Sequence, residues 1–443
     1  MKLFIKGKTD KMIGAMALLL FTTTSTVAQE LSINAELRPR AEYRSGYGSP
    51  ITDSSSPAGF MLQRSRLGFG FKNAYLKTNF TIQDSRTYGE AGVNSEAVSS
   101  SGSLSVYEAW ADILLIPGGS VAIGRQALKY DDNRIFSASN WSNTGTAHDV
   151  VVFKYELENS FTGNLGFAYN NDKAISKETI YSAATKYRYM GYLWVSKPLT
   201  SGLLLTALAL DEGIQKTTTD ASGTTTYSSK VDMYHRYTTG GNLKYQNPSC
   251  PFDFLATAYF QFGKTTATKN LNASLLALKM NYKVTPAFIG TLGADLYSGD
   301  DGKNTSKSKT FNWLYGAPHS FNGYMDYWTA SLPTQGLVDY YGQVAGNLTK
   351  KFSYEVGYHL FDTAKEMEYN SAKHGKSLGS ELDIKLSYKM NSCVSVEGGW
   401  GTYFLSDNSR YLKLKAADAN SRTPNWAYIS LTIKPDVFKI KLN

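Results

Sequence analysis

The sequence lacks any long hydrophobic run. No stretch of its 443 residues approaches the roughly 18 consecutive apolar residues that a helical membrane span needs. It has only two cysteines, Cys250 and Cys393, which lie in or beside short predicted turns. We therefore exclude a helical membrane anchor and a disulfide-rich fold, and we predict that the two cysteines do not pair.

Signatures of metalloenzymes are also missing. There is no His-x-x-x-His spacing and no closely paired cysteines, and the five histidines are scattered singly. We interpret His148 and His319 as hydrogen-bonding loop residues rather than catalysts. Asp300 and Asp301 lack the full ligand spacing of a calcium loop, so a solvated turn is the better interpretation. We predict no enzyme activity, no metal and no cofactor.

Proline is scarce, with 12 residues, whereas aromatic residues are abundant: 31 Tyr, 21 Phe and 7 Trp. Tyr and Trp collect at membrane–water interfaces. The mean hydropathy is nevertheless only −0.31. A transmembrane β-strand shows lipid on one side and water on the other, so moderate hydropathy with many aromatic residues is typical of a membrane β-protein.

The N-terminus has the pattern of a secretory signal. Four lysines precede the apolar run 12–21, and Thr26-Val27-Ala28 follows as a cleavage site, so we predict that residues 1–28 are removed. Four Lys and one Asp lie in that segment, which lowers the net charge from +9 to +6. This charge is too modest to predict a nucleic-acid partner.

Apolar and polar residues alternate from residue 31 to 44, which places them on opposite faces of one strand. The same pattern recurs along the chain and predicts about eighteen strands. The predicted strands are 31–43, 61–72, 75–83, 104–115, 121–126, 150–156, 163–170, 188–196, 202–211, 234–245, 253–263, 272–283, 287–297, 337–348, 352–361, 378–389, 393–404 and 425–434.

Long and short connections alternate between these strands, as in bacterial outer-membrane barrels. A closed barrel also leaves no unpaired strand edge in lipid. We therefore predict an all-β fold. In this prediction, residues 29–443 form a single-domain transmembrane antiparallel β-barrel of about 18 strands with long extracellular loops and short periplasmic turns. Whether the stretch after Pro435 extends the last strand stays open.

Basic side chains gather on the polar face of the first three strands, which in a barrel faces the lumen. Cations there attract anions. Carboxylates such as Glu36 and Glu42 share this face, so a structural charge ladder between strands is an alternative. The predicted lumen cations are Arg38, Arg40, Arg64, Arg66 and Lys77.

A second charged segment lies between the strands predicted at 121–126 and 150–156. It contains Gly124-Arg125-Gln126, then Lys129 and Tyr130-Asp131-Asp132-Asn133-Arg134, with Trp141 further on. Such a segment is either a solvated loop or part of a pore mouth.

Together with Ser298-Gly299-Asp300 and the segment 311–326, this charged segment resembles the alginate-export family of outer-membrane porins. The resemblance covers essentially the whole chain after residue 28. It implies a barrel with an electropositive constriction for an anionic polysaccharide. By motif position it implies cations at Arg125, Lys129 and Arg134, with Asp131 and Asp132 as their orienting carboxylates.

These observations favour a porin of a Gram-negative outer membrane. Its partners would be outer-membrane lipid and an anionic solute, such as an anionic polysaccharide or oligosaccharide, that passes through an Arg/Lys-lined lumen. The alternatives are a structural or adhesive barrel and an enzyme built in a barrel wall. The direction of flux and the oligomeric state do not follow from the sequence.

Overall fold

The computed structural model describes residues 29–90, 104–171, 187–219, 222, 225–227 and 232–442. The signal segment predicted at residues 1–28 lies outside the described residues. The chain forms a closed antiparallel barrel of 18 strands with almost no helix. The predicted fold class is confirmed.

Each predicted strand corresponds to one strand of the barrel, with ends that differ by a few residues. The barrel strands are β1 (Gln29–Ser45), β2 (Ala58–Lys72), β3 (Leu76–Thr87), β4 (Ser105–Ile116), β5 (Gly119–Gln126), β6 (His148–Leu157), β7 (Phe161–Tyr169), β8 (Tyr189–Thr200), β9 (Leu203–Gln215), β12 (Met233–Tyr245), β13 (Phe252–Lys264), β14 (Asn270–Thr285), β15 (Phe288–Tyr297), β17 (Leu337–Asn347), β18 (Phe352–Asp362), β21 (Ser377–Lys389), β22 (Val394–Leu405) and β23 (Asn425–Ile433).

The long loops carry a few short elements of their own. These are β10 (Thr217–Thr219), β11 (Thr225–Tyr227), β16 (Lys307–Ser308), β19 (Met367–Tyr369), β20 (Ala372–His374), the 3₁₀ turn η1 (Pro318–Ser320) and the helix α2 (Asp407–Leu414). No helix among the described residues is long and apolar enough to cross a membrane.

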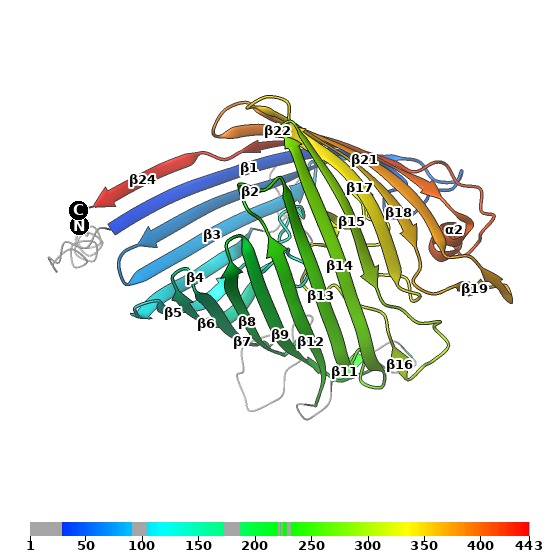
Figure 1. Cartoon of the computed structure of the whole chain (residues 1–443), viewed down its shortest axis with the longest axis horizontal. Coiled ribbons are helices and arrows are strands. Elements are labelled where there is room, and N and C mark those ends of the chain that lie inside the picture. Colours follow the sequence, from blue (N-terminus) through cyan, green and yellow to red (C-terminus); the bar gives the residue numbers. More distant parts are fainter. Residues whose placement is uncertain are drawn as a thin grey trace, which may run out of the picture.

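The barrel closes where its last strand meets its first. β1 pairs with β2 on one side and with β23 on the other, and Arg40 lies opposite Ser430. Beyond Pro435, β24 (Asp436–Leu442) continues along the same edge of β1 after a register shift. The last stretch of the chain therefore extends the final strand. Its end lies beside the start of β1, where Leu442 pairs with Gln29 (Figure 1).

Alternation along the strands separates an apolar outer face from a polar inner face. Phe69 and Phe80 lie opposite each other on β2 and β3, and both are exposed on the outside. Arg64, on the other face of β2, is only 3% exposed. A one-residue slip would exchange these faces, so the observed register confirms the predicted inside–outside assignment of these strands.

The short turns are closed by local hydrogen bonds. The Oδ1 atom of Asn73 accepts the backbone N–H groups of Tyr75 and Leu76, both at 2.8 Å, between β2 and β3. Asn391 does the same for Cys393 and Val394. Asn forms such turns readily because its side chain can replace a backbone acceptor. Cys250 and Cys393 are both free thiols in the structure.

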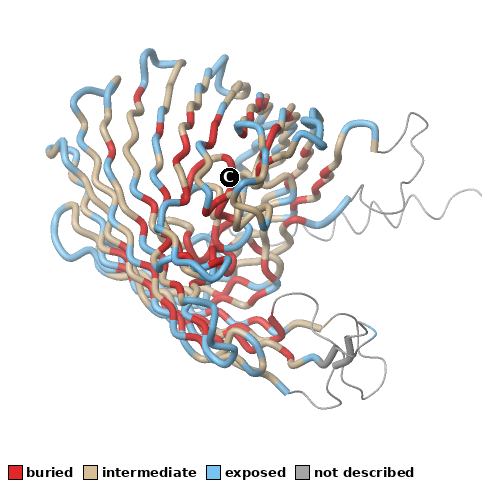
Figure 2. The backbone as a smooth tube through the Cα atoms, turned by 90° about the vertical axis from the view of Figure 1, so that its right-hand side faces the viewer, coloured by how far each residue is buried: buried red, intermediate tan, exposed pale blue. Residues whose placement is uncertain are grey.

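The hydrophobic core lies inside the barrel. Two long loops, 127–147 and 298–336, fold inward and supply buried rings such as Phe136, Trp313 and Trp328. Buried segments accordingly gather within the ring of strands (Figure 2). We call these segments loop A (127–147) and loop B (298–336). Packing of the two loops divides the lumen.

Candidate functional site

Loops A and B join each other across the lumen. Phe136 and Tyr315 form a parallel β-bridge, in which Ser137 N–H donates to the Tyr315 carbonyl at 3.0 Å and Tyr315 N–H donates to Ile135 at 3.2 Å. The two rings stack with centroids 5.7 Å apart. This contact makes a layer that spans part of the lumen.

Two cavities lie beside these loops, and each is lined by residues of loop B. A vestibule of about 1090 Å³ is lined by residues at the long-loop ends of the strands, including Asn170, Ile214 and Thr265. A chamber of about 480 Å³ is lined instead by mid-strand residues such as Thr257 and Lys385.

Loop A rests on four arginines of β1 and β2, which we call the basic wall: Arg38, Arg40, Arg64 and Arg66. Their guanidinium groups donate to backbone carbonyls of the loop rather than to side chains alone. Arg38 reaches Ser142 O at 2.9 Å, and Arg40 reaches Trp141 O at 2.8 Å. The further contacts are Arg64 to Asn140 O and Ser142 O, both at 3.1 Å, and Arg66 to Thr144 O at 3.3 Å.

Only part of the positive charge of the basic wall is balanced. Arg64 donates to Glu36 at 2.7 Å, and Arg40 pairs with Glu42 at 2.8 Å. Within the described part of the chain, Arg38 and Arg66 have no ion pair with a carboxylate. Backbone carbonyls are neutral, so the four arginines and two carboxylates leave a formal charge of +2 on this wall.

The remaining cations predicted from the sequence lie elsewhere. Lys77 lies opposite Asp112 and lines a separate recess near the short turn at residues 73–74. Arg125 lines the vestibule, where its partly exposed side chain pairs with Asp149 at 2.9 Å. Lys129 is exposed. The structure therefore does not bring these three residues to the basic wall.

Arg134 is only 4% exposed, although it forms part of the chamber lining, and its predicted selectivity role stays a prediction. Its guanidinium group contacts Asp132 at 2.9 Å, Asp295 at 2.7 Å and the Tyr297 hydroxyl. Burial alone would lower the pKa of Arg134, but Asp295, Tyr297 and Asp132 together raise it well above its ordinary value. Arg134 thus stays charged and fixes loop A to β15.

The two predicted orienting carboxylates have different partners. Asp132 pairs with Arg134 at 2.9 Å. Asp131 instead accepts hydrogen bonds from Trp194 Nε1 at 3.1 Å and the Tyr259 hydroxyl at 3.0 Å. It therefore anchors loop A to β8 and β13 and contacts none of the predicted cations.

Five carboxylates that sequence analysis did not single out form a second charged surface, which we call the acidic wall. Glu381 accepts Met325 N–H at 2.7 Å, and Asp383 accepts Tyr324 N–H at 3.2 Å. The alternation of Glu381, Asp383 and Lys385 along β21 was the available signal, because it places three charged groups on one face. The acidic wall comprises Asp295, Asp339, Glu355, Glu381 and Asp383.

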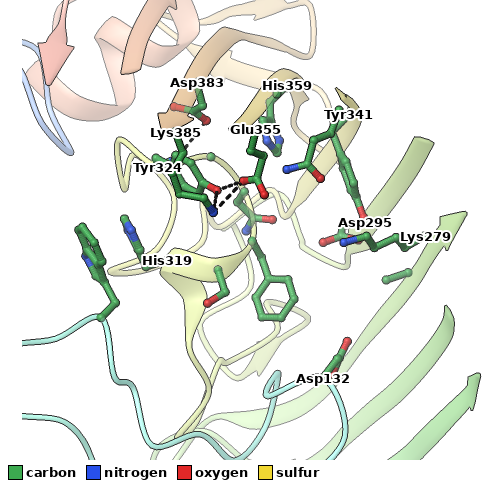
Figure 3. Close-up of a pocket in the computed structure, with 18 of the residues that line it drawn as sticks. Asp132, Lys279, Asp295, His319, Tyr324, Tyr341, Glu355, His359, Asp383 and Lys385 are labelled. Carbon is green, nitrogen blue, oxygen red and sulfur yellow. Dashed lines mark hydrogen bonds and ion pairs between the residues drawn. The ribbon is translucent and has the colours of Figure 1, made fainter. Parts of the chain in front are cut away.

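The acidic wall holds loop B and is partly neutralised by basic groups. Lys385 pairs with Glu355 at 3.0 Å, and the Tyr324 hydroxyl donates to the same carboxylate (Figure 3). His359 lies 2.9 Å from Asp339.

A continuous stack of side chains connects the basic and acidic walls. Arg40 lies over the Trp141 ring at 4.1 Å, and Trp141 stacks on His319 with centroids 4.3 Å apart. His319 in turn lies 5.7 Å from the Tyr324 ring, and Lys385 Nζ lies 5.2 Å from that ring. Trp141 belongs to loop A, while His319 and Tyr324 belong to loop B. The stack therefore fixes both loops across the lumen.

The histidines named in the sequence analysis do make hydrogen bonds. His148 bonds to the Tyr187 hydroxyl at 3.0 Å, and His319 bonds to Asp326 at 2.8 Å. Asp326 also accepts from the Tyr47 hydroxyl. Burial would raise the pKa of Asp326, but His319 and the hydroxyl donors lower it below its ordinary value.

The segment Gly375-Lys376-Ser377-Leu378-Gly379 has the Gly-x-Ser-x-Gly spacing of a hydrolase nucleophile turn. Ser377, however, begins the strand β21, whereas a nucleophile turn leads from a strand into a helix.

The described residues contain no group of three His, Cys, Asp or Glu side chains that could hold a metal ion.

Comparison with known proteins identifies the family. The alginate export family model matches residues 29–411. The chain belongs to the alginate export family. The match covers most of the barrel, so the resemblance inferred from the charged segment is confirmed. A comparison with curated protein sequences finds no match.

Solved structures share the barrel fold of this family member. Acinetobacter baumannii OccAB4 matches with a TM-score of 0.60 at 11% identity, over 94% of this chain and 99% of that one. Pseudomonas aeruginosa OccK2 (OpdF), solved in complex with glucuronate, matches with a TM-score of 0.58 at 11% identity, over 92% and 98% of the two chains. These similarities show that the chain shares the barrel fold of these proteins.

Proposed function

We propose that this barrel is an outer-membrane channel that passes anionic solutes, in particular short carboxylated saccharides. The observation that carries the proposal is the basic wall, where Arg38 and Arg66 bind neutral carbonyls and have no ion pair with a carboxylate among the described residues. A positive surface along a lumen concentrates anions and repels cations. Family membership supports the same class of solute.

The form of the site also suits a carboxylate. Guanidinium groups bind carboxylates in a planar, bidentate way. Several weak sites in series favour passage, because a single tight site would hold the solute. Glucuronate, the ligand of the OccK2 complex, is a carboxylated sugar, and this agrees with the proposal.

Two alternatives from the sequence analysis lead to different measurements. A structural or adhesive barrel would give no steady open current in a planar bilayer. A barrel enzyme would convert a solute rather than pass it. The described vestibule and chamber favour the channel.

We also propose that residues 1–28 direct export and are removed, and that the mature barrel resides in the outer membrane. Mass spectrometry of the protein from an outer-membrane fraction tests this directly. A mature chain that begins at Gln29 is expected. A chain that retains residues 1–28 would contradict the proposal.

The central experiment measures reversal potentials in a salt gradient for refolded barrels in planar bilayers. Replacing Arg38 and Arg66 with Gln should lower the anion-to-cation permeability ratio by about twofold for each charge. A unit charge about 8 Å from a passing ion contributes roughly 0.5 kcal/mol in water, with opposite sign for an anion and a cation. Screening at about 0.1 M salt roughly halves each contribution, so the ratio changes by about 0.5 kcal/mol, or about twofold, for each charge. Near 1 M salt, where the screening length is about 3 Å, the difference should largely disappear.

The matched control replaces Arg410 and Arg422, two arginines of the long loop between β22 and β23 that pair with Asp407 and Asp53. This control removes the same charge from a connection outside the barrel strands and should leave the reversal potential unchanged. If the Arg38/Arg66 variant loses folding yield while its surviving channels keep the wild-type reversal potential, the arginines are a structural ladder and the selectivity role is wrong.

A further inference from the structure

The chamber beneath loop B contains buried polar atoms that lack partners. Asn322 is only 1% exposed, and neither its Oδ1 nor its Nδ2 atom has a hydrogen-bond partner within the described residues. Asp295, also 1% exposed, leaves its Oδ1 atom unpaired there. Both residues line the chamber. Buried polar atoms are normally paired, so these atoms call for a polar ligand or ordered water.

The charge of the chamber argues against an anion as this ligand. Its lining includes five carboxylates but only three cations, with a formal charge of −2 when the histidines are neutral. Arg134 and Lys385 are already paired with carboxylates. A carboxylate in the chamber would face this excess negative charge, whereas a hydroxyl group can donate a hydrogen bond to it.

Aromatic rings lie beside the unpaired polar atoms. Phe321 neighbours Asn322 in loop B, and Tyr341 projects from β17 near Asp295 and His359 (Figure 3). A sugar ring has apolar C–H faces and a rim of hydroxyl groups, so it matches a site that combines aromatic rings with hydrogen-bonding groups. The volume of about 480 Å³ lies within the range of small-ligand sites.

We propose that this chamber binds an uncharged sugar unit, with hydroxyl groups bonded to Asn322 and Asp295 and a ring face on Phe321 or Tyr341. The inference rests on the proposed function, because it takes the lumen as the path of a saccharide. It adds that the solute carries uncharged hydroxyl-bearing units, which the chamber binds, in addition to the carboxylates that the basic wall attracts.

Calorimetry on the detergent-solubilised barrel tests this site with cellotriose, an uncharged trisaccharide. Wild type should bind cellotriose, and Asn322→Gly should weaken binding about tenfold through the lost hydrogen bonds. Asn322 has a positive φ of 43°, which glycine adopts without strain. The matched control is Asn370→Gly, at an exposed position with φ of 50° outside the lumen, and it should bind like wild type.

A second variant, Tyr341→Leu, decides the matter if Asn322→Gly does not fold, and it should also weaken binding of cellotriose. The proposal is overturned if wild type does not bind cellotriose, if it binds the corresponding triglucuronate more tightly, or if the folded variants bind cellotriose as wild type does. Calorimetry needs no open pore. If wild type binds cellotriose but its channels show no anion selectivity in bilayers, the proposed function is refuted while this inference stands.

Discussion

The basic and acidic walls hold the two inward loops by opposite chemistry. Arginines of β1 and β2 bind loop A through its backbone carbonyls, at Asn140, Trp141 and Ser142. Carboxylates of β21 bind loop B through its backbone N–H groups, at Tyr324 and Met325. Each wall therefore satisfies the backbone groups that its own charge can bond.

The two walls differ in how much charge they retain. Neutral carbonyls leave Arg38 and Arg66 charged, whereas Arg134 and Lys385 partly neutralise the acidic wall. The basic wall thus keeps a formal charge of +2, and on the acidic wall the five carboxylates outnumber Arg134 and Lys385. We therefore expect a transverse field across the lumen. The charged residues fix the loops, and on the proposed function they also shape the field; mutations can separate these two roles.

The largest effect is expected from Arg134, which joins loop A to the acidic wall. Arg134→Gln should cost about 3–5 kcal/mol of unfolding free energy, because it leaves Asp132 and Asp295 buried without their cation. Urea unfolding in detergent measures this loss. The double variant with Asp295→Asn should recover part of it. If the single variant is as stable as wild type, the pair does not hold the loop.

A somewhat smaller loss of stability should follow when a charge is placed on the lipid-facing outside of the barrel. Leu37 is exposed on the outer face of β1, and Leu37→Arg should destabilise the folded barrel in lipid by about 2–4 kcal/mol if the residue lies near the bilayer midplane. Asn34→Arg, on the lumen face of the same strand, is the matched control and should be mild. Equal effects in refolding titrations would show that the register is wrong.

The sequence was sufficient to predict the walls of the barrel. Strand alternation is a local property with a period of two, so residues such as Arg38, Arg64 and Phe69 could be assigned to a face without tertiary information. The long and short connections then predicted closure. Each of these features depends on neighbouring residues alone.

The interior could not be predicted in the same way. Arg134 lies in a loop without periodicity, and its burial depends on Asp295, which is 161 positions away. The inward folding of loop B likewise depends on Glu381 and Asp383. Their alternation along β21 is visible in the sequence, but their partners are backbone N–H groups, which every residue except proline has, so the sequence does not show which loop they bind. Arg125 belongs to the same charged segment as Arg134 and has the same charge, yet it lines the vestibule instead of being buried beside Asp295.

The free energy of unfolding should depend on pH through Lys413, a lysine that contacts loop B. Lys413 of α2 donates to the Tyr327 carbonyl of loop B and lies 4.7 Å from the Trp328 ring. Burial lowers the pKa of Lys413 from 10.5 to about 8. Between pH 8 and 10.5 the unfolded chain therefore holds a proton that the folded chain releases, so stability should rise with pH in this window.

The slope from this one group is at most about 1.4 kcal/mol per pH unit. Lys413→Met keeps the apolar stem and removes the titration, so the difference in unfolding free energy between wild type and variant should depend on pH only in this window. Parallel stability curves between pH 8 and 10.5 would contradict the assignment. Below pH 8 the lysine is protonated in both states, and the difference should be constant.

The smallest effect, and the sharpest test of the comparison, concerns Glu397 of β22, which is not one of the five carboxylates of the acidic wall but lines the same chamber. Its carboxylate lines the chamber and accepts hydrogen bonds from the Tyr428 hydroxyl at 2.7 Å and from Ser387 at 3.2 Å. Glu397→Gln keeps an acceptor for these donors but removes one negative charge. If the two walls set opposite fields, this variant should raise the anion-to-cation permeability ratio, by less than about twofold for one charge.

Glu366→Gln, on an exposed loop where Glu366 pairs with Lys373, removes the same charge outside the lumen and serves as the control. A shift in the same direction as the Arg38/Arg66 variant would show that the walls do not act as opposite sides of one field. Unchanged selectivity would show that ions pass along the basic wall alone, out of range of Glu397.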